Sequence, residues 1–378
     1  MDISAFQSGR YEQRLEYKAF LPEFICHEWV VSDPELTDLL GRADRALGAL
    51  NAFAQLIPDI DFFIRMHVAK EATQSSRIEG TQTNIEDAFK DAADLRPEDR
   101  DDWAEVQNYI CGIRFAIDEL ENLPLSNRLL RQTHEILLAG VRGKHKQPGE
   151  WRVSQNWIGV SLKNAAFVPP HHEHVPELMG DLEELLHAED LFAHPLLRIA
   201  IAHYQFETIH PFLDGNGRLG RLMISLYLAS EGLLKKPALY LSDYFEKNKT
   251  AYVDHLMAVR EGNHLRSWLV FFLYGVEQTA RSSAEVFHAI LVLKQGIESE
   301  VLPQFSARRL ATAQVLIRHL YGQPVIDVKK AAQVTGATVT TVSALIRDLV
   351  AHGVLTEITG QRRNRLFLFQ KYFDLFQK

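Results

Sequence analysis

Helical spacing runs through most of this 378-residue chain, and it constrains the fold more than any other feature of the sequence. Apolar residues recur every three or four positions, which places them along one face of a helix. Strand signals are few before residue 320. Such a chain must form its core by packing helix on helix, so we predict a mainly α fold. The clearest predicted helices span residues 33–56, 61–79, 125–138, 195–208, 217–230 and 264–293.

One segment before residue 320 has the pattern of strands instead. In residues 156–168, two short apolar runs flank Leu162, Lys163 and Asn164, and two prolines follow at 169 and 170. This pattern is typical of a β-hairpin.

The last part of the chain differs from the rest in charge and in pattern. The net charge is -8, yet residues 302–378 carry 11 Lys/Arg and 4 Asp/Glu, leaving 30 basic and 45 acidic residues elsewhere. We predict helices at 307–320, 328–334 and 338–352, followed by strands at 354–359 and 365–370 around a basic turn. Three helices and a basic hairpin predict a winged helix-turn-helix, a separate module with its own partner preference.

Composition excludes some broad classes. Hydrophobic content is 46% and charged content 24%, which are ordinary globular values. No apolar run reaches the roughly 18 residues of a membrane helix. The first residues lack the build of a signal peptide, so we expect a cytoplasmic protein with no membrane partner. Cys26 and Cys111 form no disulfide framework and are expected to be reduced core thiols.

Residues 210–221 carry the parts needed to bind phosphates between two apolar helices. They read HPFLDGNGRLGR. Gly215 and Gly217 have no Cβ, so the backbone can approach a ligand closely where the second helix begins and its N–H groups attract anions. Arg218 and Arg221 are three positions apart and lie on one face of that helix. Two guanidinium groups there suit a polyphosphate.

Two further residues of the loop suit catalysis. Asp214 supplies a hard oxygen ligand for Mg²⁺ that also binds phosphate oxygens. His210 opens the loop, and imidazole titrates near neutral pH, as a general base should.

This segment resembles the Fic motif, HPFxDGNGRxxR, and matches it at every specified position; the resemblance extends over about residues 125–257. It implies a helical Fic core that transfers AMP from ATP to a protein Ser, Thr or Tyr hydroxyl. His210 would deprotonate the hydroxyl, and Asp214 would hold Mg²⁺ between the α- and β-phosphates. The implied ATP-binding residues are Gly215, Asn216 and Gly217 as the anion hole, Arg218 and Arg221 on the β- and γ-phosphates, and the intervening Leu219 and Gly220.

Residues 75–80 fit a second Fic pattern, Ser/Thr-x-x-x-Glu-Gly/Asn, which in the family marks an inhibitory helix. Ser75 and Glu79 are four positions apart and share a helix face, and Gly80 can end the helix. The resemblance implies that Glu79 pairs with Arg221, which then cannot hold the γ-phosphate. Because the pattern is short, an ordinary surface helix would also carry it.

Two more segments resemble parts of the family. The hairpin at 156–168 looks like the flap that pairs with the target backbone as an added strand, although a purely structural hairpin would have the same pattern. Residues 239–248 resemble the segment that closes the adenine side of the pocket. Asn248 is the candidate for a base or ribose contact there, whereas Tyr240 and Tyr244 fit a core better.

These features divide the chain into residues 1–115, helical with the inhibitory helix; 116–300, the Fic core and following helices; and 301–378, the winged helix. The leading hypothesis is an autoinhibited adenylyltransferase with ATP, Mg²⁺ and a protein target, itself included. Alternatives are a Fic-fold enzyme that removes AMP or transfers another phosphate group, and a nucleotide-sensing transcription regulator. The intact His210 argues against the regulator, since sensing needs no base. DNA contact by the last domain and a homodimer stay open.

Overall fold

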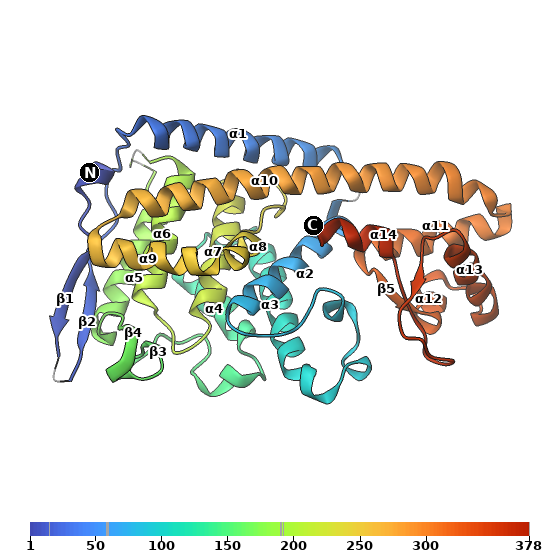
Figure 1. Cartoon of the computed structure of the whole chain (residues 1–378), viewed down its shortest axis with the longest axis horizontal. Coiled ribbons are helices and arrows are strands. Elements are labelled where there is room, and N and C mark those ends of the chain that lie inside the picture. Colours follow the sequence, from blue (N-terminus) through green and yellow to red (C-terminus); the bar gives the residue numbers. More distant parts are fainter. Residues whose placement is uncertain (15, 58–59, 190, 192, 378) are drawn as a thin grey trace.

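A computed structural model describes residues 1–14, 16–57, 60–189, 191 and 193–377, and helices dominate it (Figure 1). The six helices expected from the apolar spacing are all present, with ends within three residues of those predicted. The helices are α1 Pro34–Leu56, α2 Ile60–Ile78, α3 Arg100–Glu119, α4 Asn127–Leu137, α5 Val175–His187, α6 Pro195–Ile209, α7 Asn216–Ser230, α8 Ser242–Lys247, α9 Lys249–Gly262, α10 Leu265–Gly296, α11 Ala307–Gly322, α12 Val328–Thr335, α13 Val339–Ala351 and α14 Gln370–Phe373.

Helices α6 and α7 form the centre of the molecule. Every residue of α6 from Leu196 to Ile209 is buried, and so is most of α7. A helix that is buried on all sides needs neighbours on all sides, and α5, α10, α2, α3 and α4 supply them. The loop that joins α6 to α7 is therefore set on a rigid, fully packed support.

Two long helices run side by side along one edge of the molecule, as Figure 1 shows for α1 and α10. The start of α1 is fixed by Asp33, whose side chain accepts from the N–H of Leu36, and by Pro34 in the first turn. Helix α10 continues as a π-helical turn, Ile297–Val301, and leads to the C-terminal helices.

The strands of the described residues form three small antiparallel sheets. The hairpin predicted at 156–168 is confirmed as β3 Ile158–Gly159 and β4 Ala165–Phe167. A hairpin of β1 Gly9–Gln13 and β2 Lys18–Pro22 was not predicted, because β1 is largely exposed and has no clear apolar alternation. The N–H of Phe20 donates to the carbonyl of Val168 at 3.0 Å, so the N-terminal hairpin supports the end of the second one.

The C-terminal residues contain the three predicted helices α11, α12 and α13, with α12 and α13 bent by 109° about Gly336. The two predicted strands are shorter than expected, as β6 Thr356–Glu357 and β7 Leu366–Leu368, and β5 Val325–Asp327 joins them in the order β5-β7-β6. This part packs on α2. The ring of Phe63 lies 5.1 Å from that of Tyr321, and the ring of His67 lies 5.0 Å from that of Phe376.

One expectation about the cysteines is wrong. Both thiols are free, but Cys111 is exposed, because it lies on the outer face of α3 between buried neighbours, and Cys26 is only half-buried.

Within the described residues, no single helix has the length and hydropathy to cross a membrane; only α12 and α13 taken together, across their bend, satisfy that test. The expected cytoplasmic location stays a prediction.

Candidate active site

The loop between α6 and α7 begins at a strained residue. His210 ends α6 with φ 50° and ψ 60°, in the left-handed region that a residue with a Cβ rarely adopts. Its carbonyl accepts from Arg152 Nε at 2.9 Å and from Asn156 Nδ2 at 3.1 Å. Such strain persists where the surroundings hold it in place, and it is concentrated at functional sites.

The imidazole of His210 is uncharged at neutral pH. Burial, together with the nearby cations Arg260 and Arg152, lowers its pKa to about 4, against the opposing effects of the Glu79 carboxylate and the Glu207 carbonyl. An uncharged ring can accept a proton, which is the state that a general base requires.

The first turn of α7 forms a cradle for an anion. Gly215 precedes the helix with φ 77°, and the side chain of Asn216 closes the loop through two 2.8 Å hydrogen bonds with the N–H and carbonyl of Phe212. A Cβ added to Gly217 would lie 2.2 Å from Glu79 Oε1. A carboxylate therefore lies directly against the start of α7, where the helix favours negative charge.

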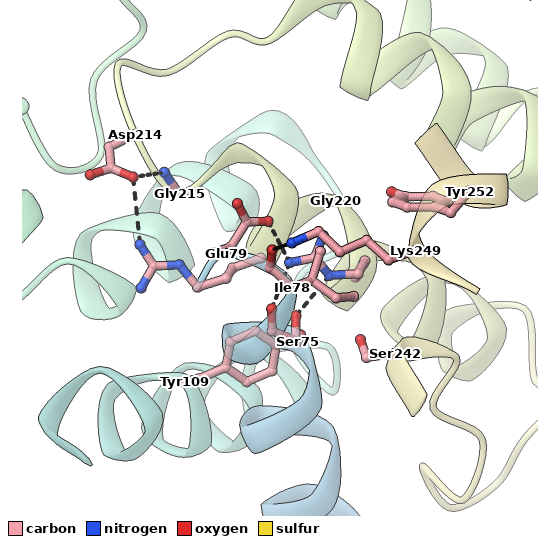
Figure 2. A network of polar contacts seen from close by, with 12 residues as sticks. Ser75, Ile78, Glu79, Tyr109, Asp214, Gly215, Gly220, Ser242, Lys249 and Tyr252 are labelled. Carbon is pink, nitrogen blue, oxygen red and sulfur yellow. Dashed lines mark hydrogen bonds and ion pairs between the residues drawn. The ribbon is translucent and has the colours of Figure 1, made fainter. Parts of the chain in front are cut away.

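Arg221 is the centre of the contacts between α2 and α7. Figure 2 shows its partners Ser75 and Glu79. Its Nη2 lies 2.7 Å from Glu79 Oε1 and donates to the carbonyl of Ser75 at 2.9 Å, while its Nε donates to Ser75 Oγ at 2.9 Å. Burial raises the pKa of the Glu79 carboxyl, but the charge and hydrogen bond of Arg221 outweigh it, so the pKa lies below its ordinary value. Ser75 and Glu79, predicted to share a helix face, thus meet on one guanidinium.

Arg218 has a different carboxylate partner. Its Nη1 lies 3.1 Å from Glu105 Oε2 of α3, and its Nη2 lies 3.6 Å from Asp214 Oδ1. Arg218 and Glu105 are both buried, whereas the Asp214 side chain is 43% exposed. The loop therefore presents Asp214 to solvent beside Arg218, whose side chain is buried.

His134 of α4 supports the loop and was not identified from the sequence. Its ring stacks on Phe212 at 3.8 Å, and its Nδ1 accepts from the N–H of Gly149 at 2.9 Å. Its Nε2 must then carry the proton and donate to the carbonyl of Asp214 at 2.9 Å. Nothing in the sequence separates this histidine from the other helical ones.

Lys249 was also missed. Its Nζ donates to the carbonyl of Ile78, the last residue of α2, at 2.5 Å (Figure 2). A lysine favours the carbonyl end of a helix, both as a donor and as a positive charge. Asn248, the predicted base or ribose contact, lies next to it, but its exposed side chain donates to the carbonyl of Tyr244.

A buried carboxylate fixes α2 against its neighbours. Glu71 accepts from the hydroxyl of Tyr109 at 3.0 Å and from the hydroxyl of Ser242 at 2.6 Å, which joins α2 to α3 and α8. Burial raises the pKa of this carboxyl. The helix that carries Ser75 is therefore held one turn before the contacts with Arg221.

The hairpin at 156–168 begins beside the loop, where Asn156 donates to the carbonyls of His210 and Phe212, and it has an open edge. Trp157, Ile158 and Val160 are exposed, and β3 pairs only with β4 among the described strands. An exposed edge of this kind is what a peptide needs to add a strand.

Comparison with known proteins matches these residues to two related family models. Residues 37–118 match the model "Fic/DOC family N-terminal", and residues 124–228 match the model "Fic/DOC family". The chain is 30% identical over 160 residues to "Protein adenylyltransferase Fic" of Aedes aegypti and 31% identical over 152 residues to that of Culex quinquefasciatus. These matches cover 41% and 39% of this chain but only 30% and 28% of the relatives.

Solved structures show the same fold. A Fic family protein from Desulfovibrio desulfuricans G20 superposes with a TM-score of 0.55 at 20% identity, over 89% of this chain and 96% of that one. Fic-1 (residues 134–508) from C. elegans superposes with a TM-score of 0.52 at 22% identity, over 69% of this chain and 75% of that one.

Proposed function

We propose, since this chain belongs to the Fic/DOC family, that it is a protein adenylyltransferase, which moves AMP from ATP to a Ser, Thr or Tyr hydroxyl of a target protein or of itself. The relatives that it matches carry that activity in their names.

One observation carries the proposal. The carboxylate of Glu79 occupies an anion cradle formed by the start of α7, Gly217 and Arg221. A site that accepts a carboxylate through a helix start and a guanidinium has the donors that a phosphate also requires. A polyphosphate bound there would lie against the loop that His210 opens.

The transfer then follows from the residues present. The uncharged imidazole of His210 takes the proton of the target hydroxyl, the hydroxyl oxygen bonds to the α-phosphorus, and the bond to pyrophosphate breaks. The N–H groups of residues 215–217, with Arg218 and Arg221, would balance the negative charge of the phosphates. Positioning and charge are the main contributions of a protein to such a step.

Asp214 fits the predicted Mg²⁺ ion. Its carboxylate is 43% exposed at the loop and would share the ion with phosphate oxygens, as Mg²⁺ often does. The ion would supply positive charge beside the phosphates.

Glu79 would restrain the enzyme. Its ion pair uses the side of Arg221 that a γ-phosphate would need, and its carboxylate repels phosphate from the cradle. Removal of AMP and transfer of another phosphate group remain alternatives, since either would use the same cradle. A regulator that only senses nucleotide would not need the base.

Radiolabelled ATP tests the reaction. Glu79→Gly protein would be incubated with Mg²⁺ and ATP labelled at the α- or the γ-phosphorus, with Glu79→Gly/His210→Ala as the matched control. AMP transfer labels protein only from the α position and only with His210 present. Label from the γ position would mean phosphate transfer, and no label on any protein offered would contradict transferase activity.

A second candidate function concerns the C-terminal residues. The 109° bend between α12 and α13 lies in the range of helix-turn-helix motifs. Arg362, Arg363 and Arg365 are exposed on the turn between β6 and β7, and Lys329 and Lys330 are exposed at the start of α12. We infer that these basic residues contact DNA. Anisotropy of a labelled duplex should show binding that falls as salt rises; binding without salt dependence, or none, would favour protein docking, including a homodimer.

A further inference from the structure

Arg152 lies between the hairpin and the loop and is almost fully buried, although the proposed chemistry does not use it. Its guanidinium donates to main-chain carbonyls: Nε to His210 at 2.9 Å, Nη2 to Pro170 at 2.5 Å and to Ile209 at 3.2 Å, and Nη1 to Ser154 at 3.3 Å. Among the described residues, no carboxylate lies within ion-pair distance of it.

A buried cation of this kind is costly to fold. Taking a charge out of water without an opposite charge costs several kcal/mol before its hydrogen bonds offset the loss. Burial lowers the pKa of Arg152 to about 10, because the charged guanidinium is less stable there than in water. A neutral side chain would avoid this cost, so the cation points to a role beyond stability.

The carbonyls that Arg152 binds belong to two functional segments. Ser154 and Pro170 lie at the two ends of the hairpin, before β3 and after β4. Ile209 and His210 form the strained turn that ends α6. One planar group with donors at fixed angles therefore sets the distance between the base of the hairpin and the backbone of the proposed catalytic histidine.

We propose that Arg152 is a positioning residue that holds the hairpin and His210 in one register, so that a hydroxyl on a peptide strand paired with the hairpin meets the imidazole. This proposal rests on the function proposed above. Asn156 has the same role by a neutral route, since its Nδ2 donates to the carbonyls of His210 and Phe212 at 3.1 and 2.9 Å.

The charge of Arg152 has a second effect. Arg260 of α9 and Arg152 both disfavour a charged imidazole at His210, whereas Glu79 after α2 and the Glu207 carbonyl of α6 favour it. Loss of Arg152 should therefore raise the pKa of His210, whereas loss of the neutral Asn156 should leave it nearly unchanged. This difference between the two variants separates the effect of the Arg152 charge on His210 from the effect of its geometry.

Four variants in the Glu79→Gly background test the proposal: Arg152→Gln, Arg152→Lys, Asn156→Ala and, as the matched control, Arg131→Gln. Arg131 donates to the Gly149 carbonyl in the same loop but has no contact with His210 among its described hydrogen bonds. We expect kcat to fall about a hundredfold in Arg152→Gln, as for a displaced catalytic group, with KM for ATP within about twofold. Asn156→Ala and Arg152→Lys should lose less, and Arg131→Gln should match its parent.

The pKa of His210, followed by NMR and assigned with His210→Ala, is a readout that does not depend on activity. It should rise in Arg152→Gln and stay constant in Asn156→Ala and Arg131→Gln.

The proposal would be overturned if Arg152→Gln had the same kcat, and the same pKa of His210, as Arg131→Gln. If Glu79→Gly transferred no AMP at all, the proposed function would fail, while the NMR titration would still decide whether Arg152 acts on His210. If Arg152→Gln did not fold, Arg152→Lys and Asn156→Ala would decide the question.

Discussion

Two arginines on one turn of α7 are each paired with a carboxylate, but the two pairs are set in different surroundings. In the first pair, Arg218 and Glu105 are 5% and 7% exposed, and Glu105 lies in the second turn of α3. In the second, Arg221 is 2% exposed, but Glu79 is 40% exposed and follows the last residue of α2. Gly80 comes next, with φ 105°.

The difference separates a structural pair from a replaceable one. Breaking the first pair would leave the buried guanidinium of Arg218 with the more distant, partly exposed Asp214 as its counter-charge. The carboxylate of the second pair can instead move into water while Arg221 takes another anion. A phosphate is such an anion. Arg218 thus keeps its pair with Glu105 when it also reaches a phosphate, whereas Arg221 must leave Glu79 to bind one. The following predictions test that distinction.

The largest expected effect is on stability, through the first pair. Glu105→Gln should lower the free energy of unfolding by about 3 kcal/mol, the lower end of what is seen when one partner of a buried pair is removed. Glu79→Gln should lower it by less than Glu105→Gln does, because the Glu79 carboxylate is partly exposed and Arg221 keeps its hydrogen bonds to Ser75. Urea denaturation followed by circular dichroism measures both. Equal losses would mean that the two pairs are equivalent and that Glu79 is structural.

The next effect is on activity, through the second pair. Glu79→Gly should raise self-modification or target modification roughly ten- to a hundredfold, since a hydrogen bond to a charged group contributes about 1.5–3 kcal/mol. Adding Arg221→Ala should remove most of that gain, because the freed guanidinium is what the γ-phosphate would use. Rates from α-labelled ATP measure it. Wild type and Glu79→Gly with the same rate on every target would refute the restraint.

The sequence predicted the loop and its partner helix because their chemistry is local. His210, Asp214, Arg218 and Arg221 lie within one turn and one loop, and Ser75 and Glu79 share a helix face, so spacing alone brings each set together. Glu105, Arg152, His134 and Lys249 were missed for the opposite reason. Each reaches the site from a distant segment, and only tertiary packing decides that Glu105 of α3, rather than another acidic residue, meets Arg218.

A smaller effect concerns Lys249, which holds the end of α2 near the second pair. Lys249→Ala removes a donor from the Ile78 carbonyl, and a hydrogen bond of this kind contributes about 1 kcal/mol. Since the end of α2 carries Glu79, we expect a gain in transfer of about fivefold or less. Lys235→Ala, at an exposed lysine between α7 and α8, is the control. A gain in the control as large as in Lys249→Ala would show that the contact does not restrain the helix.

The smallest expected effect is that of pH on the second pair. The pKa of Glu79 is below its ordinary value of 4.5, because Arg221 outweighs the effect of burial. A lowered pKa means that the carboxylate stays charged, and its pair with Arg221 intact, at every pH above 4.5; the restraint should be lost only on acidification below that value. The ratio of the Glu79→Gly rate to the wild-type rate should therefore stay constant from pH 8 to pH 6.

Glu207 also titrates within this window, because burial raises its pKa to about 7. It is present in both proteins, and the same ratio measured in a Glu207→Gln background removes its influence. A ratio that falls toward 1 by pH 6 in both backgrounds would mean that the effect of burial on the pKa of Glu79 exceeds that of Arg221. The ion pair would then be weaker than its 2.7 Å separation indicates.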